Sequence, residues 1–501
     1  MSADSSRPAP GSADFGNWQR SQQLGLLGLN PVLSIAGLVL ILGAGGMLMF
    51  LGFLPALVYV LVALLVFGPL AVKVGGKSLF ARLVRRASFV RAVRRRETAY
   101  VSGPLSPVPY GRFRLPGLLA ASQLFEARDA YGEAFAMLRI PVTNSYVVPV
   151  RADADGDALV DPEAVDTMVA TWSGFLQALP QWPDLRALSV TVEAVPDPGN
   201  RIATEVERMR ADGPAAQPVS GFTTEVMGEL AAAATVGSAA LHTRLALVFT
   251  GGRGGRGGER RGPEEMAVEV GTQLPDMLGS LAGTGAGAAR AMTAGQLAAT
   301  AWAAFHPAEA AEVDDTASLE DLDWGGVGPA AARERWDRYQ HDSGISVSWL
   351  MDGAPRGAVP HTVLKRLLEP HPHLPAKRVT LYYRPLDPAA AAAWADRQTK
   401  AIATTPGQRI ASRALSSSQA EANARDEARG ASVTRFAVVT TVTVTDETQL
   451  RRAVAAMRNL HASARLVMHQ AYGQQSVAFS VGLGLGVLTP DHVTLPKVLT
   501  Q

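Results

Sequence analysis

The sequence predicts an α/β protein, with an N-terminal two-helix transmembrane hairpin followed by two related layered α/β units of the ferredoxin-like kind. Three observations predict this class: a charge-free apolar stretch near the N-terminus, alternating strand and helix patterns after residue 97, and a weak repeat offset by about 190 residues. The 501 residues are 47% hydrophobic and 18% charged, so several folded units are expected and a disordered chain is not. The absence of cysteine excludes a disulfide framework, a thiolate zinc site and a cysteine nucleophile.

The apolar stretch covers the 49 residues from Leu24 to Val72 without one charge. A helix crosses the bilayer core with about 20 apolar residues, so the stretch fits two spans. Pro55 is the natural break, which places the spans at roughly 32–52 and 55–72. A secretory signal has a shorter apolar region and a cleavage site, so this segment is expected to persist in the mature protein. Three glycines offer close approach to a neighbouring helix: Gly43, Gly45 and Gly46.

A basic segment follows the spans, and no acidic residue occurs between residues 24 and 96. The membrane-surface candidates are Lys73, Lys77, Arg82, Arg85, Arg86, Arg91, Arg94, Arg95 and Arg96. Because basic residues flank the cytoplasmic ends of spans, both termini and the bulk of the chain are expected in the cytoplasm, at a bacterial inner (cell) membrane. The sequence LFARLVRRASFVRAVRRR predicts an amphipathic juxtamembrane helix on anionic lipid. Direct nucleic-acid binding is the weaker interpretation, since membrane adjacency already explains the arginines.

Eight strands are predicted after residue 97 from alternating or β-branched patterns. They are 134–142, 145–153, 187–195, 240–250, 344–352, 378–386, 434–445 and 464–472. Helices between them are expected to begin at Asp-Pro pairs, where the acid caps the helix and proline occupies its first position. These pairs are Asp161-Pro162, Asp197-Pro198 and Asp387-Pro388.

The repeat appears when ALSVTVEAVPDPG is placed beside KRVTLYYRPLDPA. In each half a long strand with a Thr-Arg pair follows, LHTRLALVFT or VTRFAVVTTVTVT, and then a helix, which predicts two related units. Between them six acids in the 13 residues Glu312–Trp324 predict a solvated linker rather than a calcium site. The predicted domains are a cytoplasmic tail (1–23), the hairpin (24–72), the basic helix (73–97), the first unit (98–306), the acidic linker (307–334) and the second unit (335–501).

The segment AVKVGGKS, Ala71–Ser78, resembles a relaxed phosphate-binding loop. That loop requires a preceding strand and a following helix whose N–H groups hold phosphates. Here the loop follows a predicted span, so Lys77 is interpreted as a membrane-flanking residue. A membrane-anchored nucleotide-binding protein that uses this loop stays as an alternative.

Two other motifs are interpreted without a nucleic-acid or metal site. The segment GGRGGRGGERRG, Gly251–Gly262, has no aromatic residue for stacking on bases and is expected to be a loop between a strand and a helix. His371 and His373 lack a third ligand at metal-site spacing. The sequence therefore predicts no enzyme, no catalytic residues, no cofactor and no metal.

Several blocks resemble a family: FGNWQRSQQLGLLGL, SGPLSPVPYGRFRLPGLLAASQLFEARDAYGEAFAMLR, QHDSGISVSWLMDGAPRG, LLEPHPHLPAKRVTLYYRPLDP and AYGQQSVAF. They are similar to two-span integral membrane proteins of Streptomyces and other actinobacteria, over about residues 15–490. Members of that family are similar in layout to PrgI-like membrane proteins of conjugative type IV secretion systems, which are typically encoded beside a separate ATPase.

The resemblance implies a non-catalytic inner-membrane scaffold or coupling subunit of a conjugation-like (type IV-like) secretion apparatus. Implied partners are membrane lipids, a separate secretion ATPase, other inner-membrane subunits and further copies of the chain, with nucleic acid only as indirect cargo. An EccE-like subunit of a type VII secretion complex is the competing interpretation, because it likewise joins two spans to a soluble domain.

Overall fold

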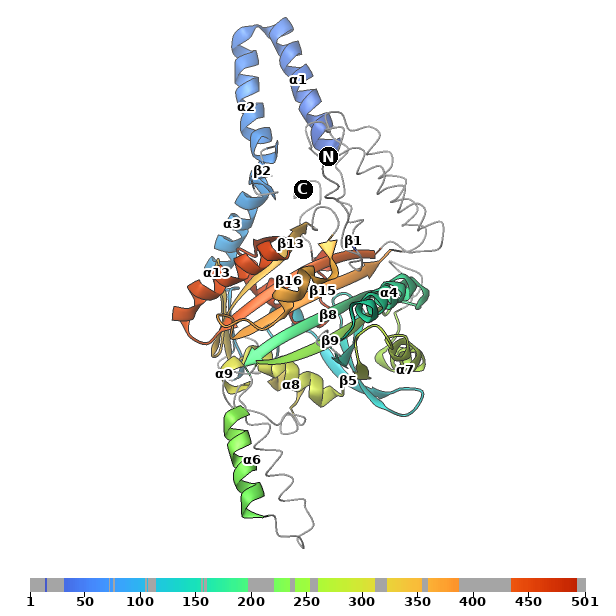
Figure 1. The fold of residues 1–501 in the computed structure, drawn as a ribbon. Coiled ribbons are helices and arrows are strands. Elements are labelled where there is room, and N and C mark those ends of the chain that lie inside the picture. The colour runs from blue at the N-terminus through green and yellow to red at the C-terminus, as the bar shows by residue number, and fades with distance from the viewer. Residues whose placement is uncertain are drawn as a thin grey trace, which may run out of the picture.

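A computed structural model shows a mixed α/β protein with a large antiparallel sheet and an N-terminal apolar helix (Figure 1). It describes residues 14–15, 31–71, 73–74, 77–103, 106, 114–154, 156, 160–196, 220–234, 239–252, 260–310, 322–353, 359–386 and 434–492. The helices are α1 (Pro31–Leu51), α2 (Phe53–Ala71), α3 (Leu79–Arg94), α4 (Pro162–Ala178), α6 (Gly221–Ala234), α7 (Pro263–Gly279), α8 (Ala294–Phe305), α9 (Pro307–Ala310), α10 (Lys365–Leu368), α13 (Glu447–Ser463) and α14 (Gln475–Gly482).

Thirteen strands of the described residues form one sheet. They are β4 (Ala99–Val101), β5 (Gln123–Arg128), β6 (Ala134–Ile140), β7 (Ser145–Asp153), β8 (Leu185–Pro196), β9 (Ala239–Thr250), β10 (Ala288–Ala291), β11 (Ala331–Glu334), β12 (Tyr339–His341), β13 (Gly344–Gly353), β15 (Ala376–Pro385), β16 (Thr434–Val444) and β17 (Val467–Gln470). Two small pairs lie outside it: β1 (Asp14–Phe15) with β14 (Val359–Pro360), and β2 (Lys73–Val74) with β3 (Lys77–Ser78). Every pairing among the described strands is antiparallel, including pairs such as β7–β9 and β8–β15 whose strands are not consecutive in the chain.

The strand order has an internal symmetry centred on the β8–β15 pair, which we call the seam. Outward from the seam, one side runs β8-β9-β7-β6-β5 and the other runs β15-β16-β13-β12-β11. A short strand, β10 or β17, also pairs with the third strand of each side. Thr191 and Thr380, 189 residues apart, face each other across the seam, and their hydroxyl oxygens lie 3.2 Å apart.

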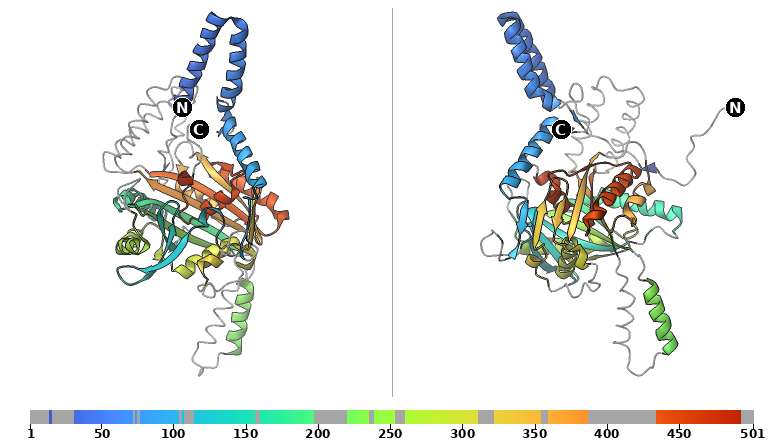
Figure 2. Two further views of the ribbon diagram at one scale, coloured as in Figure 1. Left: turned by 180° about the vertical axis from the view of Figure 1, so that it is seen from behind. Right: turned by 90° about the vertical axis from the view of Figure 1, so that its left-hand side faces the viewer.

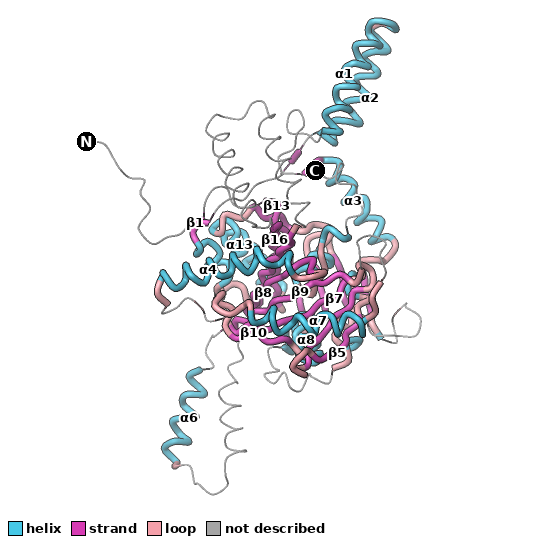
Figure 3. Tube along the Cα trace, turned by 90° about the vertical axis from the view of Figure 1, so that its right-hand side faces the viewer, coloured by secondary structure: helices cyan, strands magenta, loops and turns pink. Residues whose placement is uncertain are grey.

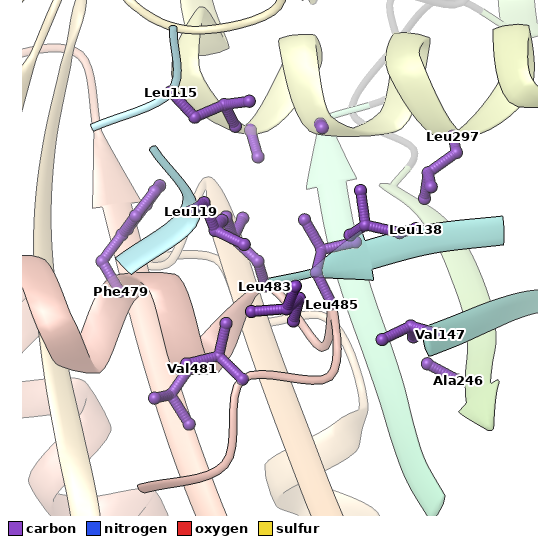
Figure 4. Close-up of a cluster of buried hydrophobic side chains, with 14 of the residues drawn as sticks. Leu115, Leu119, Leu138, Val147, Ala246, Leu297, Phe479, Val481, Leu483 and Leu485 are labelled. Atoms are coloured by element: carbon purple, nitrogen blue, oxygen red, sulfur yellow. The ribbon is translucent and has the colours of Figure 1, made fainter. Parts of the chain in front are cut away.

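Helices cover both faces of the sheet. On one face, α4 and α7 pack on the strands of the first half, and α13 packs on those of the second (Figure 3). Helix α10 contributes to the same cluster as α13. On the other face, α8 and α14 cover a single cluster of buried side chains to which strands of both halves contribute (Figure 4). Because one apolar cluster spans both halves, their packing is coupled across the sheet.

The chain from the last turn of α14 onwards crosses the seam on this second face. Side-chain donors from β9 and β15 hold its backbone: Arg244 Nη2 donates to Leu483 O at 2.7 Å, and Thr380 Oγ1 donates to Gly482 O at 2.7 Å. Gly484 has a φ of +67°, and a Cβ there would collide with the Thr191 side chain. Only glycine combines this left-handed backbone with so close an approach.

A buried ion pair also crosses the seam. Arg378 and Glu193 are direct partners in the register, and the Arg378 guanidinium donates to the Glu193 carboxylate. Arg244 is buried beside them. Burial by itself raises the pKa of the Glu193 carboxyl, but Arg378 and Arg244 hold that pKa below its ordinary value. Burial lowers the pKa of Arg244 to about 10, against the attraction of Glu193.

Most predicted elements within the described residues are confirmed. All eight predicted strands occur, and α4 begins at Pro162 after Asp161. The pairs Asp197-Pro198 and Asp387-Pro388, residues 311–321 of the acidic linker and most of the Gly-Arg segment lie outside the described residues. The described ends of the predicted linker contain α9 and β11. The break between the apolar helices was predicted wrongly at Pro55: it falls at Gly52, with a φ of +89°. Proline fits the first turn of α2, because N–H groups there lack a helical acceptor in any case.

The two halves of the sheet do not coincide with the two units predicted from the sequence. Strand β4, predicted within the first unit, pairs with β11 of the second half.

The apolar helices α1 and α2 project from one end of the body formed by the sheet and its covering helices, and α6 projects from the opposite end (Figures 1 and 2).

Candidate membrane-proximal interface

Helices α1 and α2 expose apolar side chains almost throughout. Ile41, at the middle of α1, is 71% exposed, and Leu65 of α2 is 76% exposed. In water such a surface is unfavourable, by roughly 25 cal/mol for each Å² of apolar area. The two helices pack side by side, and a Cβ at Gly43 would lie only 2.5 Å from the Tyr59 hydroxyl oxygen. Gly43 therefore permits the predicted close approach, whereas a Cβ at Gly45 or Gly46 would meet nothing within 4 Å.

Within the described residues one helix is long and apolar enough to cross a membrane. Its apolar stretch is Ser34–Leu51, which contains no charged residue. The apolar run in α2, Phe53–Leu65, is shorter than a span of this kind. Of the two expected spans, one is therefore matched by a helix of spanning length among the described residues, whereas the adjacent helix α2 has a shorter apolar run.

The segment between α2 and α3 forms the small β2–β3 pair. Lys73 lies opposite Ser78, and Val74 lies opposite Lys77. The Ser78 hydroxyl accepts the Ala81 backbone N–H at 3.2 Å and so caps the N-terminus of α3. A helix, α2, precedes this segment in place of the buried strand that a phosphate-binding loop requires. The nucleotide-binding alternative therefore lacks the strand–loop–helix context on which it depends.

Helix α3 has an inner face that contacts the body. Ala81 is buried, and the Phe89 ring packs edge-to-face on Trp336 with centroids 5.3 Å apart. Burial lowers the pKa of the Arg85 guanidinium, while Asp352 on the body opposes that shift by attraction. Arg85 thus faces the body, although the sequence predicts it on the membrane surface.

The outer face of α3 carries exposed apolar side chains among arginines. Leu83 is 60% exposed and Val90 is 42% exposed, so part of the predicted apolar stripe points away from the body. These side chains form the floor of a shallow groove of about 650 Å³. The groove is lined by Leu83, Arg86, Ala87, Val90, Arg91, Arg94 and Arg95. Of the other basic candidates, Lys73 and Lys77 lie in β2 and β3, Arg82 lies on α3, and Arg96 follows its end with a φ of +60°.

One contact of this region has no counterpart among the elements predicted from the sequence. The pairing of Asp14 with Pro360 and of Phe15 with Val359 brings the chain before α1 to the body. Two residues give no recognisable strand signal, and only the position of β14 after folding provides their partner.

One cluster of imidazole and hydroxyl side chains lies inside the body. His341 Nε2 lies 2.8 Å from Ser346 Oγ, which lies 2.7 Å from Thr443 Oγ1, but these side chains are buried from solvent. No group of three potential metal-binding side chains occurs in the described part of the chain. His371 and His373 lie together in their turn, with ring centroids 5.6 Å apart.

Two buried histidines predict acid sensitivity of the fold. Burial lowers the pKa of His341 and of His461 to about 4, against roughly 6.5 in an unfolded chain. Between these values the unfolded state binds protons that the folded state does not, so the free energy of unfolding decreases as pH falls from about 6.5 towards 4. Thermal unfolding of the purified protein at about pH 7 and at about pH 5 should show this loss. The variant His461→Gln should lose less stability than wild type over the same interval; an equal loss would contradict the assignment.

The chain matches no protein-family model and no curated protein sequence.

Proposed function

We propose that this chain is a non-catalytic membrane scaffold whose cytoplasmic body docks a separate ATPase of a conjugation-like secretion apparatus. The observation that carries the proposal is the attachment of an exposed apolar helix pair to a large folded α/β body. In the proposed arrangement α1 and α2 form a transmembrane hairpin in the inner membrane, and both ends of the hairpin return to the cytoplasm.

Contacts at both ends of the hairpin support this topology. Before α1, Phe15 pairs with Val359 of the body, and after α2, Phe89 packs on Trp336 of the body. A folded body lies on one side of a membrane, so segments that contact it before and after the helices lie on that side together. An even number of crossings between those contacts follows, which fits two spans.

The body is proposed to contain two ferredoxin-like units joined at the seam. In the first half the chain order is β7-α4-β8-α6-β9-α7-β10, which is the β-α-β-β-α-β pattern of that motif with α6 as an addition between β8 and β9. Its strands lie in the order β10-β7-β9-β8, and those of the second half lie in the order β17-β13-β16-β15. The same order in both halves supports a duplication, as the repeat in the sequence predicts.

Docking of an ATPase rests on the resemblance to PrgI-like proteins of conjugative systems. The position of α6 is compatible with it, because α6 projects from the end of the body opposite α1 and α2 (Figure 2). In the proposed topology that end faces the cytoplasm, where a motor protein would be bound.

The test is gentle detergent extraction of the tagged full chain from native membranes, followed by mass spectrometry of the co-purifying proteins. Recovery of a secretion ATPase with conjugation-like subunits is the expected result. Recovery of type VII components would instead favour the EccE-like alternative. Recovery of the chain alone, from extracts in which other membrane complexes remain intact, would overturn the scaffold proposal. ATP binding that is lost in Lys77→Ala would revive the nucleotide-binding alternative.

A separate prediction tests the topology. Reporter fusions at residue 10 and after residue 110 should both give cytoplasmic signals. Because the chain has no native cysteine, the pair Phe15→Cys and Val359→Cys should form a disulfide on mild oxidation, whereas Phe15→Cys with Val142→Cys should not. A periplasmic signal from either fusion would contradict the hairpin.

A further inference from the structure

The outer face of α3 combines apolar and cationic side chains in one groove. Leu83, Ala87 and Val90 supply the apolar floor, and arginines at positions 86, 91, 94 and 95 supply guanidinium groups around it. No acidic residue occurs in α3. The groove therefore matches a ligand that has a negative charge beside an apolar portion.

The groove is separate from the packing of α3 on the body. Ala81, Val84 and Phe89 are buried or half-buried, whereas Leu83 and Ala87 are exposed. A helix that only joined the hairpin to the body would need apolar side chains on its inner face alone. The additional exposed apolar residues between arginines are therefore available to another partner.

We propose that this groove binds an anionic phospholipid, with the arginines around its phosphate and the floor against the adjoining acyl carbons. The inference rests on the proposed membrane anchoring. Only the short segment 72–78 separates the end of α2 at Ala71 from the start of α3, so α3 begins near the head-group layer at the foot of the hairpin (Figure 1). Basic side chains in that layer are attracted to the negative charge of anionic lipid head groups.

Other occupants fit the groove less well. A second copy of the same face would oppose arginine to arginine without an acid between them. A single-stranded nucleic acid would use aromatic side chains for stacking, and none lines the groove. An acidic protein segment would pair with the arginines. It would not explain why the floor of the groove is apolar, or why the groove lies beside the hairpin.

The experiment uses the full-length chain with one introduced cysteine, Ala87→Cys, reconstituted into vesicles of phosphatidylcholine with or without phosphatidylglycerol. Maleimide labelling of this cysteine should be roughly tenfold slower in the anionic vesicles, because four arginines hold the lipid over the floor. The difference should disappear when Arg86, Arg91, Arg94 and Arg95 are all changed to glutamine. A matched control changes four exposed arginines of the body to glutamine, Arg366, Arg451, Arg452 and Arg458, and should keep the difference.

Membrane integration is measured on the same samples by resistance to carbonate extraction. Integrated protein with equal labelling in both vesicle types would overturn the lipid site and leave the proposed anchoring intact. Protein that carbonate extracts from both vesicle types would overturn the anchoring itself. Protection of the introduced cysteine by a polyanionic peptide or by single-stranded DNA, but not by phosphatidylglycerol, would assign the groove to that other class of ligand.

Discussion

Replacing Ile41 by arginine should reduce membrane insertion of the protein by roughly a hundredfold. Ile41 lies at the middle of α1, and an arginine at the centre of a transmembrane helix costs about 2.5 to 3.5 kcal/mol. Ile41 is already 71% exposed, so its replacement removes little packing within the chain. In a water-exposed helix the same substitution would change stability by only about 0.5 kcal/mol. The amount of full-length protein in carbonate-washed membranes measures the effect.

Val268 provides the matched control for this variant. It is also 71% exposed, but it lies on α7, which packs on the sheet of the body. Val268→Arg should therefore reach the membrane fraction in the same amount as wild type. If Ile41→Arg and Val268→Arg gave equal yields in membranes, α1 would not lie in lipid, and the hairpin proposal would fail.

Replacing Glu193 by glutamine should destabilise the body by about 3 to 5 kcal/mol. The substitution keeps the size of the side chain but removes a carboxylate placed against two buried guanidinium groups, those of Arg378 and Arg244. Removing one partner of a buried ion pair leaves uncompensated charge in a medium of low dielectric constant. We expect a decrease in the thermal unfolding temperature on the order of 10 °C, measured in detergent by circular dichroism.

An exposed ion pair supplies the comparison. Arg151 Nε and Asp153 Oδ1 lie 3.2 Å apart, and both side chains are 60% exposed, so Asp153→Asn should cost less than about 1 kcal/mol. The double variant Glu193→Leu with Arg378→Met should recover part of the stability lost in Glu193→Gln, because apolar packing can replace a buried pair. Equal unfolding temperatures for Glu193→Gln and Asp153→Asn would show that the seam does not depend on this carboxylate.

Individual elements were predictable where a local pattern determines them. Strand β7 follows from a run of apolar and β-branched residues, and α13 follows from apolar residues at helical spacing after the Asp446 cap. Short strands near one edge of the sheet were harder to predict: β4 and β11 have three and four residues, too few for a period-two pattern to stand out. These short strands become regular only when a neighbour supplies their hydrogen bonds.

The positive charge of the candidate interface was predictable from the sequence, but the side of α3 that faces the body was not. The basic run after α2 is evident in the sequence, but the division of α3 into two faces depends on Trp336, which lies 247 positions further along the chain than Phe89. Arg85 and Arg86 are neighbours with the same side chain, yet Arg85 faces the body and Arg86 lines the groove. No local pattern distinguishes them.

By itself the sequence determined the apolar helix, the basic segment beside it and the eight strands of the α/β body, because hydropathy, charge and short-range periodicity are properties of neighbouring residues. Only the tertiary structure decided that β8 and β15 join the two halves in one sheet, that the chain from Val481 to Leu488 crosses this seam, and that residues 14–15 return to the body. Each of these depends on which edges and faces remain unpaired after the local elements form. That outcome is set by long-range packing and hydrogen bonding, which leave no periodic signal in the chain.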